Sequence, residues 1–184
     1  HASINATYNK NTLTYLGDDA PSLYCSNHQT GQLTRGLVGL PFPYFYGFKS
    51  DGIFQNMDEV KAYTNAEGNM IMPNAEPGDV RFVDIDGDGV IGDGDKTYIG
   101  KGIPDWVFGL NLGFDWKGLD FSILLQGQLG AQAYNVSRRI DLGAVNLPKY
   151  MLNRWTGEGT TNKYPKFEVG DATNYVVSDV WVED

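Results

Sequence analysis

The chain has 184 residues, of which 41% are hydrophobic and 13% aromatic, and it carries a net charge of −9 at pH 7. This apolar content excludes a disordered chain, and the negative charge excludes the basic footprint that nucleic-acid binding requires. No stretch approaches the roughly 20 continuous apolar residues of a membrane helix, so any crossing of a membrane would have to be made by strands.

The N-terminal part carries one strand signal followed by a polar region. Apolar and polar residues alternate from Ala2 to Tyr8, which predicts a β-strand, and the pattern resumes from Thr12 to Leu16. Because the sequence has no initiator Met or signal peptide and opens in this alternation, we expect it to be an excised piece of a longer protein. Residues 17–35 are polar and rich in turn formers, and they predict a long loop. The lone Cys25 provides neither a disulfide framework nor a zinc cluster.

Residues 39–56 combine several aromatic residues with two prolines, which forbid a central strand but permit an edge strand or an extended segment. The aromatic side chains could line a ligand surface or form a small satellite core under the loop. They are Phe42, Tyr44, Phe45, Tyr46 and Phe48. Next, Asn56 and Glu59 have the N-cap and N3 spacing that predicts a short helix over residues 57–64.

An acidic loop over residues 84–95, entered through a short extended run at 79–83, is the sharpest motif in the sequence. Its carboxylates at loop positions 1, 3, 5 and 12, its glycine at 6 and its aliphatic residue at 8 follow the calcium loop of EF-hands. A hard cation prefers six to eight oxygens at about 2.3 to 2.6 Å, and alternate side chains of a tightly wound loop can converge on one point. The expected ligands of a structural Ca²⁺ are the side chains of Asp84, Asp86, Asp88 and Asp95 and the backbone carbonyl of Val90.

Two features of this loop differ from an EF-hand. Position 12 is Asp95 in place of glutamate, which shortens the reach of that ligand, and the sequence around the loop lacks the flanking helices. We therefore expect an EF-type loop on a β scaffold, where calcium would stabilise the fold without acting as a sensing switch. An acidic, solvated turn without an ion is the alternative.

Residues 103–133 carry the strongest strand signal. Bulky apolar residues occupy every second position over 106–116 and again over 119–125, and a two-residue turn at Lys117-Gly118 joins the two runs. This arrangement predicts a hairpin with its large apolar side chains on one face. The predicted cross-strand pairs are Trp116 with Leu119, Phe114 with Phe121 and Leu112 with Ile123.

The composition of this face bears on what covers it. Aromatic residues lie toward both ends of the first run and aliphatic residues lie in the middle. The run from Trp106 to Trp116 would span roughly 33 Å, or roughly 25 Å at a tilt of about 40°, which is the height of the apolar band of an outer-membrane barrel. The pattern alone fits either a face that covers a soluble core or a face that meets lipid.

The remainder of the chain carries weaker signals. Residues 130–135 are predicted to continue the second strand before the pattern breaks at 137–140, residues 147–155 to form a helix and residues 175–182 to be extended. His28 is the only internal histidine and has no serine or cysteine nearby in the context of a nucleophile. We therefore predict no catalytic residues and no enzyme.

Five runs of residues together resemble the C-terminal third of SusC/RagA-type TonB-linked outer-membrane transporters. The resemblance extends over nearly the whole chain and is weakest at residues 17–38. The runs are Tyr46-Gly-Phe-Lys-Ser-Asp-Gly-Ile-Phe-Gln-Asn56, Pro77-Gly-Asp-Val-Arg-Phe-Val-Asp-Ile-Asp-Gly-Asp-Gly89, Ile103-Pro-Asp-Trp-Val-Phe-Gly109, Trp116-Lys-Gly-Leu-Asp-Phe-Ser122 and Ser178-Asp-Val-Trp-Val-Glu-Asp184.

The resemblance implies an all-β fold, namely a fragment of a large antiparallel transmembrane β-barrel with long extracellular loops and one EF-type calcium loop. Residues 1–16 would be a barrel strand, 17–102 an extracellular loop region with the short helix and the calcium loop, and 103–133 a transmembrane β-hairpin with a periplasmic turn. Residues 134–184 would be a second extracellular loop region that leads to a truncated strand.

The resemblance also implies a function in the outer membrane of Bacteroidetes-type bacteria. The chain would be part of a TonB-dependent transporter that contacts outer-membrane lipid and imports oligosaccharides or peptides. Its partners would be a SusD-like surface lipoprotein, acting as a lid, and TonB, acting through a segment outside this sequence. The alternative is a soluble, calcium-stabilised β-sandwich carbohydrate-binding module, in which the apolar face of the hairpin would pack against a second sheet.

Overall fold

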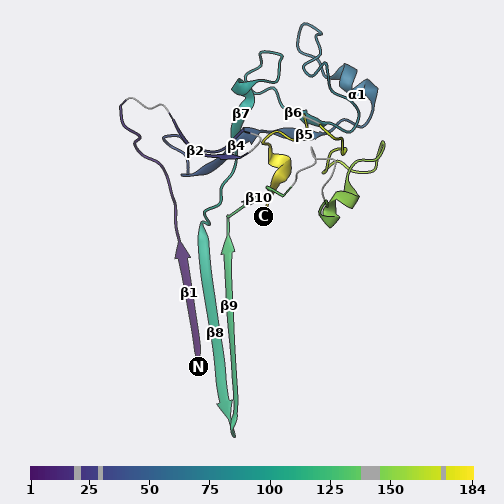
Figure 1. Cartoon of the computed structure of the whole chain (residues 1–184). Helices are drawn as coiled ribbons and strands as arrows, with labels where there is room; N and C mark the ends of the chain where they lie inside the picture. The colour runs from purple at the N-terminus through teal and green to yellow at the C-terminus, as the bar shows by residue number, and fades with distance from the viewer. Residues whose placement is uncertain (19–21, 29–30, 138–145, 171–172) are drawn as a thin grey trace.

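A computed structural model describes residues 1–18, 22–28, 31–137, 146–170 and 173–184. The fold is all-β, with antiparallel sheets, and the described residues add one short α-helix and three short 3-10 helices. Figure 1 shows a long sheet, here called the ribbon, that projects from a part made of shorter strands and loops, here called the head. None of the described helices has the length and apolar character needed to cross a membrane.

The ribbon consists of β1 (Ala2–Tyr8), β8 (Trp106–Trp116) and β9 (Leu119–Leu129), in the order β1-β8-β9. The three predicted hairpin pairs are confirmed, because Trp116 lies opposite Leu119, Phe114 opposite Phe121 and Leu112 opposite Ile123. The turn has φ angles of 48° at Lys117 and 84° at Gly118. Positive φ at both central residues is the geometry that matches the twist of a two-residue hairpin.

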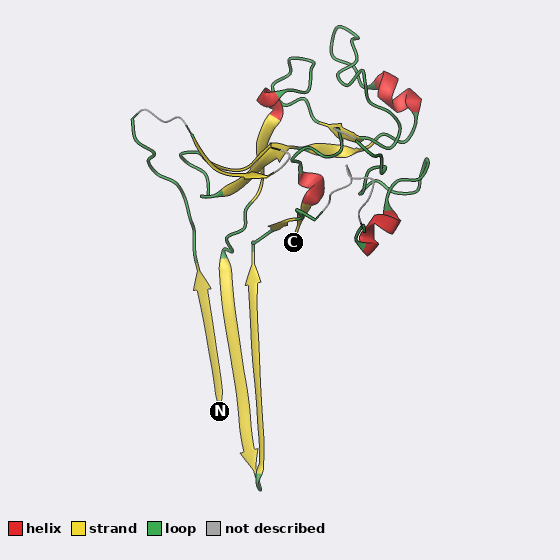
Figure 2. Cartoon of the chain, viewed as in Figure 1, coloured by secondary structure: helices red, strands yellow, loops and turns green. Residues whose placement is uncertain are grey.

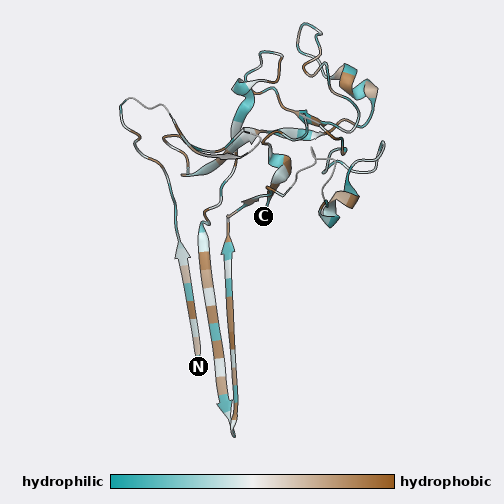
Figure 3. Ribbon diagram, in the orientation of Figure 1, coloured by the Kyte–Doolittle hydropathy of each residue, from teal (hydrophilic) through white to brown (hydrophobic). Residues whose placement is uncertain are grey.

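Strand β1 extends this arrangement by a third strand. It pairs antiparallel with β8 from Ala2 opposite Leu112 to Tyr8 opposite Trp106. Because residues directly opposite each other share a face of the sheet, the alternate residues of β1 lie on the same side as the bulky residues of the hairpin. Figure 3 shows the resulting alternation of hydrophobic and hydrophilic residues along β8 and β9.

The head contains a four-stranded sheet of order β2-β3-β4-β7 and two strand pairs, β5 with β6 and β10 with β11. Its strands are β2 (Leu23–His28), β3 (Gly31–Gly36), β4 (Tyr44–Phe48), β5 (Ser50–Ile53), β6 (Val80–Phe82), β7 (Lys96–Gly100), β10 (Ala133–Tyr134) and β11 (Val182–Glu183). Its helices are α1 (Met57–Ala62) and the 3-10 helices η1 (Asp93–Asp95), η2 (Lys149–Asn153) and η3 (Asp179–Trp181).

The start of α1 follows the predicted capping pattern. The Asn56 side chain accepts a hydrogen bond of 3.0 Å from the backbone N–H of Glu59, and the Glu59 carboxylate accepts one of 2.9 Å from the N–H of Gln55. The first bond satisfies a donor that the first helical turn leaves free, and the second ties the residue before the N-cap to that turn. The helix ends at Ala62, two residues before the predicted end, because Tyr63 leaves helical geometry with ψ of 84°.

Two predictions for the first half of the chain were wrong. Residues 17–35 are not one long loop, because β2 and β3 pair there as an antiparallel hairpin. The sequence did not predict these strands because their apolar residues do not alternate with polar ones as in a half-buried strand. Strand β4 is not an edge strand, since it lies between β3 and β7. Both prolines precede its first residue, Tyr44, so they remove no hydrogen bond from the sheet. No strand forms over residues 12–16.

Three predictions for the C-terminal half also need correction. Strand β9 ends at Leu129, because Gly130 has a positive φ of 80°, and β10 is a separate strand. The helix predicted at 147–155 is only the five-residue η2, and the segment predicted to be extended at 175–182 contains η3. Residues 138–145 lie outside the described residues, and with them most of the predicted break at 137–140.

The buried core lies in the head. One cluster joins the C-terminal segment to the four-stranded sheet, because Phe45 and Ile99 pack against its buried residues Tyr134, Met151, Val177 and Trp181. A second cluster under α1 contains Phe54, Val60 and Ala75. The aromatic residues at 42–48 therefore contribute mainly to the core, as the satellite-core alternative predicted. Tyr44 is buried, Phe45 contacts the first cluster, and the ring centroids of Phe48 and Phe82 lie 5.3 Å apart.

Candidate functional site

The ribbon presents a continuous apolar face, defined here as the side of β1, β8 and β9 that carries their bulky residues. Leu110 on this face is half-buried, and the other twelve large side chains are between 38% and 79% exposed. They are Ile4, Tyr8, Trp106, Phe108, Leu112, Phe114, Trp116, Leu119, Phe121, Ile123, Leu125 and Leu129. Soluble proteins rarely leave apolar patches of more than a few hundred Å² open, and larger ones mark contacts with a protein or a membrane.

No described residue covers this face as a second layer. Figure 2 shows the ribbon extending away from the head, with no other sheet or helix along its length. The β-sandwich alternative required a second sheet packed against these side chains, and the described part of the chain does not provide one. The ribbon therefore differs from the head, whose apolar residues gather in closed clusters.

Aromatic pairs lie near both ends of the apolar face. At the end next to the head, the rings of Tyr8 and Trp106 have centroids 4.9 Å apart. At the turn end, Phe114 and Phe121 stack at 5.4 Å. The Lys117 ammonium lies 5.2 Å from the centre of the Trp116 ring. Aromatic side chains prefer the boundary between hydrocarbon and water, so this distribution is typical of strands that cross a membrane.

Glycines let side chains lie flat on both faces of the ribbon. The ring of Phe108 lies 2.5 Å from where a Cβ of Gly127 would stand, and on the opposite face the Asn5 side chain lies 3.1 Å from where a Cβ of Gly109 would stand. That opposite face is mainly polar. It carries Ser3, Asn5, Thr7, Asn111, Asp115, Asp120, Ser122, Gln126 and Gln128, with Val107 and Leu124 as exceptions. Asp115 and Asp120 lie opposite each other on this face, next to the turn.

The acidic loop brings three of the five predicted ligand residues together. Carboxylate oxygens of Asp84, Asp86 and Asp88 all lie within 4.8 Å of one another. Ligands on opposite sides of a Ca²⁺ ion stand roughly 5 Å apart, so these oxygens fit a common cation. The loop winds tightly because Asp84 accepts backbone N–H bonds from both Gly87 (2.7 Å) and Gly89 (2.9 Å).

Asp95 and Val90 are placed differently from these three carboxylates. Asp95 is fully buried, and its two oxygens accept hydrogen bonds of 2.7 Å from the backbone N–H groups of Ile85 and Gly92. It thereby ties the start of the loop to its end. The Val90 side chain points to solvent with 61% exposure, and its N–H donates to the Asp88 carboxylate at 2.8 Å.

Two further contacts shape the charge of this loop. Lys96 donates a hydrogen bond of 2.6 Å to Asp93, which lowers the pKa of that carboxyl group. This lysine therefore pairs with an aspartate outside the group of three. A Cβ at Gly94 would overlap the Asp86 carboxylate, so the missing side chain at residue 94 leaves the space that this carboxylate occupies.

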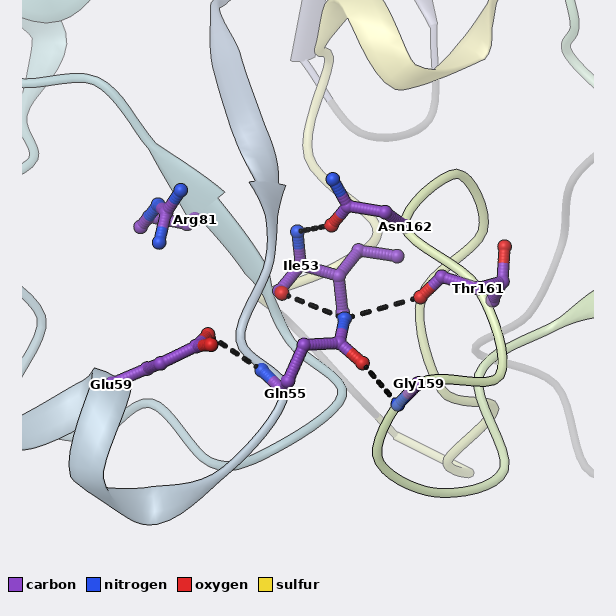
Figure 4. Close-up of a pocket in the computed structure, with 7 residues that line it drawn as sticks. All are labelled: Ile53, Gln55, Glu59, Arg81, Gly159, Thr161 and Asn162. Carbon is purple, nitrogen blue, oxygen red and sulfur yellow. Dashed lines mark hydrogen bonds between the residues drawn. The ribbon is translucent and has the colours of Figure 1, made fainter.

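A pocket in the head was not predicted from the sequence. Figure 4 shows Gln55 at its centre: its Nε2 donates to the carbonyls of Ile53 (3.0 Å) and Thr161 (3.1 Å), while its Oε1 accepts from the N–H of Gly159 (2.9 Å). Trp155 adds an indole N–H bond to the same Oε1 at 3.2 Å. Since Trp155, Gly159 and Thr161 lie about a hundred residues from Gln55 along the chain, no local pattern could have identified the pocket.

Comparison with known proteins gives one consistent result. No protein-family model matches the chain. The chain is 29% identical over 187 residues to TonB-dependent receptor P26 of Formosa agariphila, an alignment that covers 100% of the chain and 18% of the relative. TonB-dependent receptors P3 and P39 of the same organism are 27% and 28% identical, with 89% and 94% of the chain covered and 16% and 19% of the relatives.

The chain thus spans about a fifth of the length of the curated relatives that it matches. All three relatives carry the name TonB-dependent receptor, and their likeness to the chain supports a place for it in this family. The SusC/RagA subtype does not appear in these names.

Proposed function

We propose that this chain is part of a TonB-dependent transporter of the bacterial outer membrane, in which β1, β8 and β9 are neighbouring strands of the barrel wall. The observation that carries the proposal is the uncovered apolar face with aromatic pairs near both of its ends. Its mainly polar opposite face would line the barrel interior, which is polar in such proteins. The Lys117-Gly118 turn would be periplasmic and the head extracellular.

The energetics favour lipid as the cover for this face. Burying one large aliphatic or aromatic side chain contributes roughly 1.5–3 kcal/mol, and a dozen such side chains are at least 38% exposed on the ribbon. A membrane also demands that every backbone polar group is paired. Neighbouring strands of a closed barrel would supply those partners along the outer edges of β1 and β9.

Within this family, we propose that the transporter is of the SusC/RagA type, with oligosaccharides or peptides as cargo and Bacteroidetes-type bacteria as the source. It is supported by the five sequence runs, which together reach from Tyr46 to Asp184. We propose a SusD-like surface lipoprotein as partner of the extracellular head and TonB as the energy-coupling partner. Native mass spectrometry of the complete protein from its own membranes tests the first partnership, since a stoichiometric acylated protein is expected in the complex.

We also propose a structural Ca²⁺ in the acidic loop, held by Asp84, Asp86 and Asp88, with Asp95 and the carbonyl of Val90 completing the predicted set. The convergence of three carboxylates supports this, because the mutual repulsion of their charges is offset when a divalent cation binds between them. When bound, the ion would supply a rigid crosslink within the loop. Titration calorimetry on protein stripped with a chelator tests the site, and the absence of calcium heat at millimolar ion would refute it.

Placement in the membrane can be tested with two neighbouring residues of β8. Leu112 belongs to the apolar face and Asn111 to the opposite face, in the middle of the same strand. An arginine facing lipid near the bilayer midplane costs about 2–4 kcal/mol. Leu112→Arg should therefore lower the amount of folded protein in the outer membrane at least about tenfold, whereas Asn111→Arg should be tolerated much better. Equal losses for the two variants would contradict the proposal.

A further inference from the structure

The acidic loop packs against a turn that directly follows α1. This segment, residues 63–71, is here called the α1 turn. Its two arms form an isolated antiparallel bridge between Thr64 and Met70, and the N–H of Ile71 donates a hydrogen bond of 3.1 Å to the carbonyl of Tyr63. The α1 turn is therefore a small hairpin closed by backbone hydrogen bonds, and it begins where the helix ends.

The side chain of Asn65 is held in one orientation by this turn. Its Oδ1 accepts hydrogen bonds from the backbone N–H groups of Glu67 and Asn69, at 3.1 and 2.9 Å. An amide whose oxygen is engaged in this way presents its NH₂ group on the other side. This NH₂ group faces the acidic loop at Gly89, where a Cβ would stand 2.5 Å from the Asn65 Nδ2. Asn65 therefore connects the α1 turn to the middle of the acidic loop.

Gly89 is the position of the acidic loop that this contact holds. It is buried, whereas the residues on either side of it, Asp88 and Val90, are exposed. Its φ of 84° lies in the left-handed region that favours glycine. Its N–H donates a hydrogen bond of 2.9 Å to the Asp84 carboxylate, one of the three that converge. Asn65 thus lies over the residue whose backbone orients a proposed calcium ligand.

The α1 turn also holds the strand that leads into the acidic loop. The hydroxyl group of Tyr63 donates a hydrogen bond of 2.6 Å to the carbonyl of Phe82, two residues before Asp84. The rings of Tyr63 and Phe54 have centroids 5.9 Å apart, and Tyr63 packs against the core cluster under α1. The turn therefore contacts both the entry and the middle of the loop, and it connects these two points to the core.

We infer that Asn65 is a positioning residue for the acidic loop, and that calcium binding and the order of the α1 turn are coupled. Asn65 acts through Gly89, which it holds where the N–H of this glycine orients the Asp84 carboxylate. Removal of a residue that orients a metal ligand typically lowers metal affinity 10–100-fold. Because coupling is reciprocal, an ion that tightens the loop also tightens the turn. The inference rests on the proposed calcium site and adds a role for residues outside the acidic motif.

Titration calorimetry with Ca²⁺ compares three forms of the complete protein in detergent. Asn65→Ala removes the amide that lies over Gly89 and should weaken calcium binding at least about tenfold. Asn69→Ala is the matched control, because it removes the same amide group from the same turn, and the contacts described for Asn69 are made by its backbone. This control should bind calcium as the wild type does. Thermal unfolding verifies that all three forms are folded.

Amide hydrogen exchange, followed by mass spectrometry, measures the coupling itself. In the wild type, saturating calcium should slow exchange in peptides from both the acidic loop and the α1 turn, whereas in Asn65→Ala it should slow exchange in the acidic loop alone. A peptide from β4 reports any general change in stability. Equal calcium affinities of Asn65→Ala and Asn69→Ala, or an α1 turn that calcium leaves unchanged, would overturn the inference and leave the calcium site standing. A wild type that binds no calcium would overturn both.

Discussion

The carboxylate of Asp179 accepts hydrogen bonds from both the backbone N–H and the hydroxyl group of Ser50, at 2.9 and 2.6 Å, across 129 residues of chain. Next to it, the N–H of Phe48 donates to the carbonyl of Val177 at 2.9 Å. The C-terminal segment is therefore fastened to the end of β4 and the start of β5, and this contact closes the larger core cluster.

Replacement of Asp179 by alanine should loosen this attachment. The variant leaves two donors of Ser50 without their partner, and such a loss costs about 1–3 kcal/mol. Amide hydrogen exchange at Phe48 and Ser50 should become faster, while exchange at Val60 in α1 should stay unchanged. Asp179→Asn, which keeps one acceptor oxygen, should have the smaller effect; equal protection in wild type and alanine variant would contradict this account.

Gly47→Ala should disturb the same attachment by crowding. A Cβ at Gly47 would stand 2.5 Å from the carbonyl oxygen of Val177 and 2.8 Å from its carbonyl carbon, and backbone atoms cannot move away cheaply. We expect the variant to lose about 1–3 kcal/mol in the free energy of unfolding, measured by denaturant titration in detergent. Gly102→Ala is the control, because its nearest neighbours would be 3.7 Å away; similar losses for both would argue against the crowding.

Gly94→Ala should weaken calcium binding by the acidic loop, if the proposed ion is bound there. The added methyl group would displace the Asp86 carboxylate, one of the three that converge. A misplaced charged ligand should lower the calcium affinity at least about tenfold, or about 1.4 kcal/mol. Gly92→Ala lies in the same loop with its nearest neighbour at 4.0 Å and should bind calcium normally. Calorimetry compares the two, and indistinguishable affinities would count against the role of Asp86.

Lys166 should make the head sensitive to acid. Its ammonium contacts Glu76 at 2.8 Å, Glu168 at 3.1 Å and the buried Asp79 at 3.3 Å. Burial by itself lowers the pKa of Lys166, but the hydrogen bonds that its ammonium donates to these carboxylates, together with their negative charge, outweigh burial and raise it, so the lysine stays charged. The hydrogen bond with Lys166 lowers the pKa of Glu76 in turn.

The sign of the pH effect follows from the lowered pKa of Glu76. The contribution of this carboxylate to stability is present above its ordinary value of 4.5 and is lost as the pH falls through the lowered value. Lys166→Met should flatten this acid limb and cost about 3 kcal/mol at neutral pH, because Asp79 remains buried with less compensation. Unfolding measured across the acid range checks both, and an unchanged acid limb in the variant would refute the coupling.

The ribbon could be predicted from the sequence because its information is local. A period of two over Trp106 to Trp116 fixes which residues share a face, and a two-residue turn fixes the register, so every predicted pair is present. The cap of α1 is equally local, since Asn56 and Glu59 are three residues apart. The carboxylates of Asp84, Asp86 and Asp88, at alternate positions, also converge in the way that the EF-type spacing predicts.

The head could not be predicted in the same way because its order comes from contacts between distant polar residues. Asn174 is fully buried, yet it does not lie in a segment with a regular apolar pattern. Its Oδ1 accepts a hydrogen bond from the N–H of Val80 and its Nδ2 donates one to Asp79, across 94 and 95 residues of chain. Asp95 was predicted only as a metal ligand, and the pattern gave no sign that it also joins the two ends of its loop. Such hydrogen bonds depend on tertiary position, which spacing along the chain does not encode.

The position of β9 at the margin of the ribbon has a practical consequence. Among the described residues, no strand pairs with the outer edge of β9. Eleven residues of largely apolar sequence therefore offer free backbone N–H and C=O groups to a strand of another molecule. Such a margin is a template for aggregation in water. Anyone producing this segment by itself should anticipate insoluble inclusion bodies with a cross-β signature, and should refold it only with a surfactant already present.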